Sequence, residues 1–312
     1  MTLNIILFFV GLAMVVFGSD FLVDGASCVA RKLKISEFVI GIIIVGFGTS
    51  CPELVVSITG ALEGSSDIAI GNVLGSNILN ILLILGLTAV LSPIAITQGN
   101  KFKDIPILLG ISLFFCLTCL DGEINRLDAL IYLLLFAVYI VYNFRSGKKN
   151  LEEEEESEAK EYGLGLSIIM ILAGLAGLIF GGKLFVNNAV KIAQGIGASE
   201  KFIAITVLAL GTSLPELVTC VVSAAKKKGQ LALGNIVGSN VFNILLILGC
   251  SGIIKPLNTT SLNYVDMAVC LSSVLLLFLF SFTSKEQKIS KGAGYTMLAL
   301  ELAYMIYLFI KL

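Results

Sequence analysis

Long apolar runs separated by short charged turns repeat along the whole chain. A helix needs about 20 apolar residues to cross a hydrocarbon layer of about 30 Å. The pattern predicts an all-α membrane protein with ten transmembrane helices, over residues 3–30, 36–62, 67–92, 104–121, 126–145, 164–194, 199–225, 230–254, 263–283 and 292–310. The first and sixth runs exceed the required length, so we expect these helices to tilt strongly or to extend past the hydrocarbon.

The second, third, seventh and eighth predicted helices differ from the others because they are rich in Gly, Ser, Thr, Asn and Pro. Hydrocarbon offers no hydrogen-bond partner to polar side chains or to an interrupted backbone. We therefore expect these four segments to face protein or water rather than lipid.

The composition supports a membrane protein and excludes several other classes. Hydrophobic residues make up 57% of the chain and charged residues 14%, whereas soluble domains are closer to a quarter charged. The net charge of −1 provides no basic field for nucleic acid. The segment Leu3–Gly18 has neither a charged leading region nor a convincing small-residue cleavage site, so we expect it to be retained as the first span.

The residue types that commonly bind transition metals are absent or unsuitably placed. The chain has no histidine, which excludes a histidine-bound metal site and a histidine proton relay. Cys116 and Cys119 have Cys-x-x-Cys spacing but stand within an apolar run, and we interpret all seven cysteines as reduced apolar residues.

Loop charges set the predicted orientation, because Lys and Arg accumulate on the cytoplasmic side of a membrane. Loops on one side carry 15 such residues and loops on the other carry four, which are Arg126, Lys201, Lys255 and Lys311. Both termini are therefore predicted to lie outside, and residues 146–163 in the cytoplasm. This segment contains the run Glu152–Glu156, which we interpret as a solvated acidic linker, with a weak attraction for cations as the alternative.

Residues 36–93 and 199–256 are two copies of one segment, offset by 163 positions. They are identical at 26 of 58 positions without a gap, and the matches include Gly, Pro, Glu, Asn and Ser, which a shared apolar composition would not align. Each half holds five predicted helices, an odd number, so the second half must enter the membrane upside down. Inverted repeats with broken helices around a midplane site are typical of secondary transporters. We therefore divide the chain into a first five-helix repeat (1–145), an acidic linker (146–163) and a second, inverted repeat (164–312).

A six-residue motif, with Pro followed by Glu at its end, interrupts one apolar helix in each half. The two copies are Gly48–Glu53 and Gly211–Glu216. Proline removes a helix donor and clashes with the carbonyl four residues back, which frees backbone oxygens. The expected oxygen donors near the two breaks are the carbonyls around Gly46, Thr49, Ala209 and Thr212, and the hydroxyls of Thr49, Ser50, Thr212 and Ser213.

The motif glutamates, Glu53 and Glu216, are predicted to bind a transported cation. A carboxylate deep in a bilayer is costly unless it is paired or solvated, and these four helices contain no intramembrane Lys or Arg that could pair with either one. Two carboxylates together with carbonyls, hydroxyls and amides form an all-oxygen shell of the kind that suits Ca²⁺. The absence of a thiolate–imidazole set argues against Zn²⁺ or Cu⁺.

The helices that follow the motifs carry further polar residues at equivalent positions. We predict two uses for them, cation ligation or interhelical hydrogen bonding, and the residues are Ser76, Asn80, Ser239 and Asn243. Four other amides are expected to be helix-packing groups, namely Asn72, Asn77, Asn235 and Asn240. The pairs Gly71–Gly75 and Gly234–Gly238 are expected to permit close helix packing.

The acidic residues Asp20, Asp24 and Glu301 also need an explanation, because they lie in predicted helices but outside these motifs. Asp20 and Asp24 stand near the cytoplasmic end of the first predicted helix, where we expect them to reach the membrane interface. Glu301 lies inside the last helix and has no acidic equivalent in the first half, because Val138 stands at that position. We expect Glu301 to be buried against a neighbouring helix.

The paired segments Gly-Thr-Ser-x-Pro-Glu and Gly-Asn-x-x-Gly-Ser-Asn-x-x-Asn resemble the two α-repeats of Na⁺/Ca²⁺ exchangers, a family of the Ca²⁺/cation antiporter superfamily. The ten-helix layout extends the resemblance over the whole chain. It implies that Glu53 and Glu216 coordinate both Ca²⁺ and competing Na⁺. It also implies supporting ligands at Gly46, Thr49, Ser50, Ser76, Asn80, Ala209, Thr212, Ser213, Ser239 and Asn243.

Three residues separate the chain from branches of this superfamily. Several members, including the K⁺-dependent branch, carry Asp where this chain has Asn243, which argues against K⁺ co-transport. Proton-coupled relatives typically carry Glu where this chain has Gly75 and Gly238, which argues against Ca²⁺/H⁺ exchange.

The sequence therefore predicts a secondary antiporter in the cell membrane that exchanges Ca²⁺ for Na⁺ by alternating access. The alternative is Ca²⁺/H⁺ or other cation/H⁺ antiport, in which the glutamates bind protons in the return step. A passive Ca²⁺ channel is a further alternative, and it would show net Ca²⁺ flux without any counter-ion. An intramembrane enzyme is disfavoured because mid-span positions offer no nucleophile–base pair or paired aspartates. The predicted partners are Ca²⁺, Na⁺ and the lipid bilayer, with no cofactor; the oligomeric state is left open and is compatible with a monomer.

Overall fold

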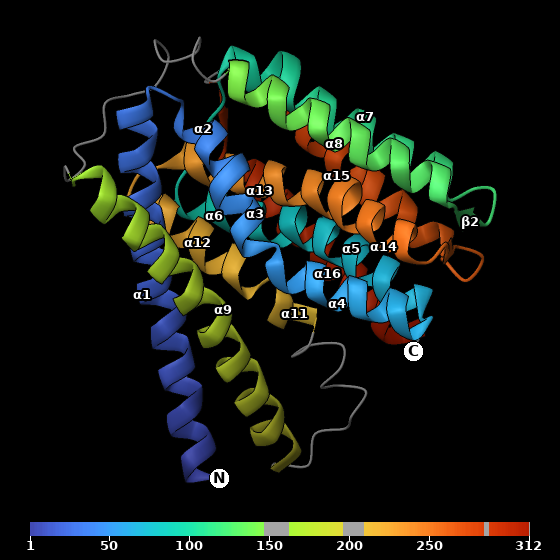
Figure 1. Ribbon diagram of the computed structural model, residues 1–312, viewed down its shortest axis with the longest axis horizontal. Coiled ribbons are helices and arrows are strands. Elements are labelled where there is room, and N and C mark those ends of the chain that lie inside the picture. The colour runs from blue at the N-terminus through green and yellow to red at the C-terminus, as the bar shows by residue number, and fades with distance from the viewer. Residues whose placement is uncertain (147–161, 196–208, 284–286, 312) are drawn as a thin grey trace.

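The computed structural model describes residues 1–146, 162–195, 209–283 and 287–311, and they form an almost entirely helical bundle (Figure 1). The first half contains α1 (Thr2–Leu33), α2 (Glu37–Ile40), η1 (Gly41–Gly46), α3 (Phe47–Thr49), α4 (Cys51–Glu63), α5 (Ser66–Leu79), η2 (Asn80–Leu85), α6 (Gly86–Leu91), β1 (Ile94–Ala95), η3 (Asn100–Asp104), α7 (Ile105–Thr118), β2 (Glu123–Ile124) and α8 (Arg126–Ser146). The second half contains α9 (Leu164–Gly195), α11 (Ala209–Thr212), α12 (Leu214–Ala225), α13 (Gly229–Val241), η6 (Phe242–Ile247), α14 (Leu248–Ile254), β3 (Leu257–Asn258), α15 (Tyr264–Thr283), β4 (Lys288–Ile289) and α16 (Lys291–Lys311).

Helices α1 and α9 form a long pair whose lower ends project beyond the other described helices (Figure 1). Glycines on both helices let the two backbones touch. A Cβ atom built at Gly18 would lie 2.8 Å from the carbonyl oxygen of Gly174, and one built at Gly174 would lie 2.6 Å from the oxygen of Gly18. Small residues that allow such close approach are a common basis for helix association in membranes.

Helices α5 and α13 occupy the interior of the bundle. Each continues without a break through a π-helical segment, η2 or η6, into α6 or α14, and the resulting helices Ser66–Leu91 and Gly229–Ile254 are largely buried. A π-helical turn has a wider hydrogen-bond ring than an α-helical turn and is often found at functional sites. The two segments begin at Asn80 and at Phe242, which precedes Asn243.

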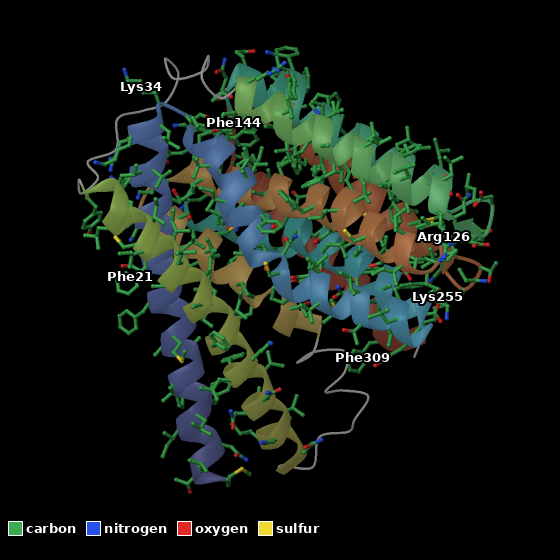
Figure 2. The ribbon with its side chains drawn as sticks, in the orientation of Figure 1. Phe21, Lys34, Arg126, Phe144, Lys255 and Phe309 are labelled. Carbon is green, nitrogen blue, oxygen red and sulfur yellow. The ribbon has the colours of Figure 1, made fainter. Side chains whose placement is uncertain are left out.

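Two short antiparallel strand pairs connect the halves of the chain. Strand β1 pairs with β4, and β2 pairs with β3, so each pair joins one strand from before the linker to one from after it. Arg126 and Lys255, which follow β2 and precede β3, lie at one end of the molecule, and Lys34 lies at the opposite end (Figure 2).

The structure confirms a multi-pass helical membrane architecture. Seven described helices are long and apolar enough to span a membrane. An eighth candidate is the broken helix made of Glu37–Thr49 and Cys51–Glu63, whose two parts meet at 48°. The expected spans 104–121 and 199–225 correspond to the shorter helices α7 and α12, and part of the latter span lies outside the described residues.

Candidate cation site

The two Pro-Glu motifs break their helices in the same way. Ser50 lies between α3 and α4 with φ −82° and ψ 5°, and Ser213 lies between α11 and α12 with φ −85° and ψ 6°. A proline follows near the start of each new helix, where its missing N–H costs no helix hydrogen bond. Glu53 and Glu216 consequently stand in the first turn of α4 and α12, where the positive end of the helix dipole stabilises a negative charge.

Each glutamate accepts a hydrogen bond from the serine of the other motif. Ser50 Oγ donates to Glu216 Oε1 at 3.3 Å, and Ser213 Oγ donates to Glu53 Oε1 at 3.5 Å. Both carboxylates are buried, with 1% of each residue exposed. The structure therefore brings together two acidic residues and two hydroxyls that are far apart in the chain.

Four buried oxygen atoms of the candidate residues have no hydrogen-bond partner among the described residues. They are Glu53 Oε2, Glu216 Oε2, Asn80 Oδ1 and Asn243 Oδ1. In the described part of the chain, no group of three or more His, Cys, Asp or Glu side chains is placed to hold a metal ion. A cation bound here must therefore take most of its ligands from neutral oxygens, which is compatible with Ca²⁺ and Na⁺ but not with a thiolate or imidazole site.

Further candidate residues contact one another across the two halves of the chain. Ser239 Oγ donates to the Gly46 carbonyl at 3.3 Å and lies 3.5 Å from Glu216 Oε1. Thr49 Oγ1 donates to Asn235 Oδ1 at 3.1 Å. Ser76 and Ser213 hydroxyls are 3.4 Å apart.

The two remaining candidates are placed less fully. Thr212 ends α11 and is half-buried, directly before the break at Ser213. Ala209 begins the same helix, but its side chain lies outside the described residues.

The amides expected to pack helices do make hydrogen bonds between elements. Asn72 Nδ2 donates to the backbone carbonyl of Glu53 at 3.2 Å, and Asn235 accepts from Thr49 as above. Asn77 and Asn240 bond to one another's backbones across the interface between α5 and α13. The expectation for all four residues is confirmed, but sequence reasoning missed the direct contact of Asn77 and Asn240 with Asn243 and Asn80.

Close packing at the expected glycine pairs is confirmed for the second repeat. A Cβ atom at Gly234 would lie 2.1 Å from the carbonyl oxygen of Phe38, and one at Gly238 would lie 2.8 Å from Ile42 Cα. Gly71 and Gly75 have no described atom within 4 Å of such a Cβ, and residues 196–208 lie outside the described chain.

Comparison with known proteins decides the family. The profile described as Sodium/calcium exchanger protein matches residues 3–145 and 166–312, which is nearly the whole chain. The chain belongs to this family. The match confirms the resemblance carried by the paired motifs, and it places the protein among transporters rather than enzymes.

Named relatives of this exchanger family cover the chain from end to end. The chain is 32% identical to the sodium/calcium exchanger MaX1 of Methanosarcina acetivorans, over 99% of both proteins. It is 37% identical to the putative antiporter CaxA of Alkalimonas amylolytica, over 96% of this chain and 97% of that protein. A solved structure of the sodium-calcium exchanger NCX_Mj, soaked with Na⁺ and Sr²⁺, is 34% identical and superposes with a TM-score of 0.86, over 97% of this chain and 98% of that one.

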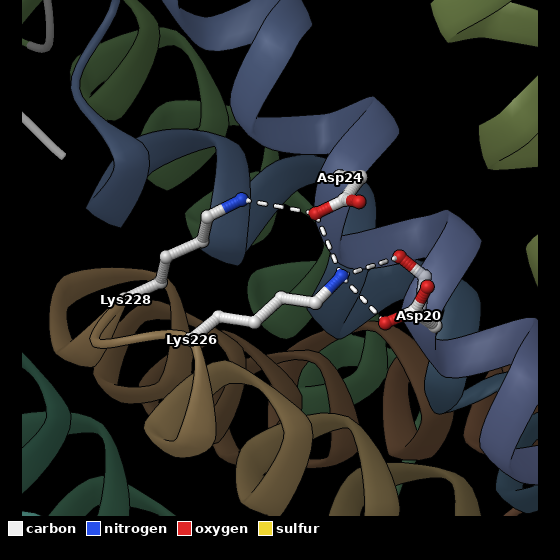
Figure 3. A network of polar contacts seen from close by, with 4 residues as sticks. All are labelled: Asp20, Asp24, Lys226 and Lys228. Carbon is white, nitrogen blue, oxygen red and sulfur yellow. Dashed lines mark hydrogen bonds and ion pairs between the residues drawn. The ribbon is translucent and has the colours of Figure 1, made fainter. Parts of the chain in front are cut away.

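An ion-pair network involves two aspartates in the C-terminal half of α1 in this exchanger-family chain (Figure 3). Lys226 Nζ lies 2.6 Å from Asp20 Oδ1 and 2.7 Å from Asp24 Oδ1, and Lys228 Nζ lies 3.4 Å from the same Asp24 oxygen. Both lysines follow α12, so the network ties α1 to the turn between α12 and α13. The sequence assigned both aspartates to the membrane interface and missed these partners.

The two lysines of this network have different environments. Burial lowers the pKa of Lys228, whose side chain is 4% exposed, and nearby acidic residues only partly oppose it. Burial also disfavours the charged form of Lys226, but hydrogen bonds to Asp20 and Asp24 overcome it and raise the pKa of Lys226. Lys226 is therefore the more firmly charged partner.

Glu301 is a third buried glutamate, as expected from the sequence. It lies on α16, which packs against α6 and η2, and 4% of the residue is exposed. Neither carboxylate oxygen has a hydrogen-bond partner among the described residues.

The seven cysteines are free thiols.

Proposed function

We propose that this protein exchanges Ca²⁺ for Na⁺ across the membrane at a site built around Glu53 and Glu216. The observation that carries the proposal is the set of four buried, unpartnered oxygens, two from the glutamates and one each from Asn80 and Asn243. Buried oxygens without partners are costly in a folded protein. A cation at their centre would supply the missing partner for all four at once.

The site chemistry suits alternating occupancy by one Ca²⁺ or several Na⁺. The two carboxylates together carry up to two negative charges, which a divalent cation or two monovalent cations neutralise. Ca²⁺ takes about 6–8 oxygen ligands. The supporting ligands we propose are the oxygens of Gly46, Thr49, Ser50, Ser76, Ala209, Thr212, Ser213 and Ser239.

Charge neutralisation explains why the two fluxes would be coupled. Moving two unpaired carboxylates through a low-dielectric barrier is strongly unfavourable. A filled site carries little net charge, so the change between outward-facing and inward-facing states would be fast only with ions bound. Ser50 and Ser213 would hold one oxygen of each carboxylate in place and leave the second for the ion.

The architecture we propose for this function is two inverted five-helix repeats, 1–145 and 164–312, joined by a cytoplasmic linker over 146–163. The reciprocal serine–glutamate bonds support it, because each motif completes the other. The strand pairs also support it. Loops assigned to the same side by charge are the ones that pair, β1 with β4 on the cytoplasmic side and β2 with β3 on the outside.

The test is ion flux in proteoliposomes. Vesicles loaded with Na⁺ and diluted into Na⁺-free buffer should take up ⁴⁵Ca²⁺, and uptake should disappear when Na⁺ is equal on both sides. Uptake that ignores the Na⁺ gradient would overturn the proposal. Parallel vesicles with a pH gradient and no Na⁺ identify proton-coupled exchange, and net Ca²⁺ flux without any counter-ion identifies a channel.

A further inference from the structure

Four asparagines connect α5 and η2 to α13 and η6 at the interface between the two halves of the chain. Asn77 Nδ2 donates to the backbone carbonyl of Asn240 at 3.2 Å, and Asn240 Nδ2 donates to the carbonyl of Asn77 at 3.3 Å. A backbone carbonyl can only accept a hydrogen bond. The NH₂ end of each of these two amides must therefore point at the backbone of the other residue.

The opposite end of the Asn77 and Asn240 amides is then the carbonyl oxygen, which can only accept a hydrogen bond, and it contacts a candidate ligand. Asn77 Oδ1 accepts from Asn243 Nδ2 at 2.9 Å, and Asn240 Oδ1 accepts from Asn80 Nδ2 at 2.9 Å. An amide that faces an acceptor must present its NH₂ group. The free end of Asn80 and of Asn243 is thus the carbonyl oxygen, and both oxygens are buried without a hydrogen-bond partner among the described residues.

We infer that Asn77 and Asn240 are positioning residues that fix which end of the Asn243 and Asn80 amides faces the transported cation. This inference rests on the proposed function, which places those two amides at the cation. It explains a choice that side-chain shape cannot make, because the two ends of an amide are nearly equal in size and opposite in polarity. With the NH₂ end inward, a partial positive charge would face the cation in a site shielded from water.

Burial strengthens this control. All four asparagines are at most 1% exposed, so water cannot replace a lost bond. Turning Asn243 around would place its Oδ1 against the Oδ1 of Asn77 and leave two acceptors facing each other. Asn77 cannot turn in response without losing its bond to the Asn240 carbonyl.

A merely structural role for Asn77 makes a different prediction, because it would act whatever residue occupies position 243. The two roles separate in a double-mutant cycle measured by equilibrium ⁴⁵Ca²⁺ binding to the purified protein in detergent. N77L removes both polar ends with a side chain of similar shape. We expect N77L and N243A each to weaken Ca²⁺ binding about tenfold, the factor for one hydrogen bond of about 1.4 kcal/mol.

In the double variant N77L/N243A, binding should be no weaker than in N243A alone, since Asn77 then has no amide to orient. Losses that multiply to about a hundredfold would overturn the inference. N243D provides a rescue, because a carboxyl group can carry its proton on either oxygen and so always has a bare oxygen to turn toward the cation, which means that no wrong end exists. In that background N77L should leave Ca²⁺ affinity unchanged or tighter, and a further tenfold loss would again overturn it.

The reciprocal cycle, N240L with N80A, tests the same idea if N77L does not fold, as judged by a monodisperse peak and a cooperative melting curve. The outcome also separates this inference from the proposed function. If the wild type binds Ca²⁺ but shows no Na⁺-driven flux, the proposed exchange is overturned, while the double-mutant cycles can still be measured by Ca²⁺ binding. If exchange is intact but the losses of Ca²⁺ affinity in the single variants multiply in the double variant, only the orienting role is overturned. A wild type that binds no Ca²⁺ would overturn both.

Discussion

In the α1–α9 pair the helices meet backbone to backbone, whereas α5 and α13, at the centre of the bundle, meet through polar side chains. In the pair, Gly18 and Gly174 lie so close that a Cβ atom on either one would meet the carbonyl oxygen of the other. At the centre, amides of α5, η2, α13 and η6 bond reciprocally across the interface. Backbone contacts depend on shape alone, while a bonded amide also has a direction. The difference fits the proposed site, because the reciprocal amide bonds can orient the two asparagines that we propose as ligands.

The strongest test of the centre is to neutralise its carboxylates. E53Q and E216Q should each abolish Ca²⁺ transport, because one remaining carboxylate cannot offset a divalent charge in a water-poor site. Na⁺-driven ⁴⁵Ca²⁺ uptake in proteoliposomes measures the effect. The matched control is E63Q, at the exposed end of the same helix as Glu53, which should transport normally. Near-normal uptake in E53Q or E216Q would remove that residue from the site.

The α1–α9 pair should be sensitive to volume rather than polarity. G18A adds one methyl group against the Gly174 carbonyl, and we expect it to destabilise the protein by about 1–3 kcal/mol, as overpacking does. Thermal unfolding in detergent measures the change. G110A is the control, because Gly110 is an exposed helical residue with no described atom within 4 Å of its Cβ, and it should be neutral or slightly stabilising. Equal stability of G18A and the wild type would contradict backbone packing.

Adding an acid at the centre should introduce a pH dependence that the wild type lacks. N243D places a third carboxyl group among like charges and against Asn77 Oδ1, an acceptor that an unprotonated acid cannot satisfy. We expect the new acid to bind a proton at neutral pH, so exchange survives there and falls on the alkaline side as the proton is lost. Na⁺-driven uptake measured against pH for both proteins tests this. Superimposable profiles would mean that position 243 does not face the ions.

The smallest effect is expected outside both regions. Deletion of Glu152–Glu156 removes acidic residues from the segment that joins the two halves, and it touches neither copy of the repeated segment. Exchange should therefore remain intact in the flux assay. Complete loss of flux in a well-folded variant would show that the linker takes part in transport.

Local signals in the sequence predicted the helices and the acidic pair, because a proline next to a glutamate in an apolar run is unusual wherever it occurs. The contacts between the halves were not predicted, because each partner is defined only in three dimensions. Asn77 and Asn240 are 163 positions apart, which is the repeat offset itself. In the inverted repeats that we propose, equivalent residues can meet only near the axis that relates them, so this offset was the available signal.

Other features left no readable trace in the sequence. Nothing in the apolar run after Asn80 indicates a π-helical turn, because Leu and Ile pack equally well in either kind of helix. Asp24 was assigned to the membrane interface from its place near the end of the first predicted helix. Its partner, Lys226, was missed because it is 202 positions away in the chain. The expected number of ten spans also depends on residues 196–208, which lie outside the described chain.

The reciprocal bonding of the two motifs has a consequence for biosynthesis. Glu53 accepts from Ser213, which is synthesised 160 residues later, and β1 pairs with β4 near the end of the chain. At about 5–20 residues per second, the first half waits on the order of ten seconds for its partners. During that interval Glu53 is in or near the bilayer without the second carboxylate or its serine. A chain that stalls at the linker would expose an incomplete polar surface to lipid, which makes it a ready substrate for membrane quality control.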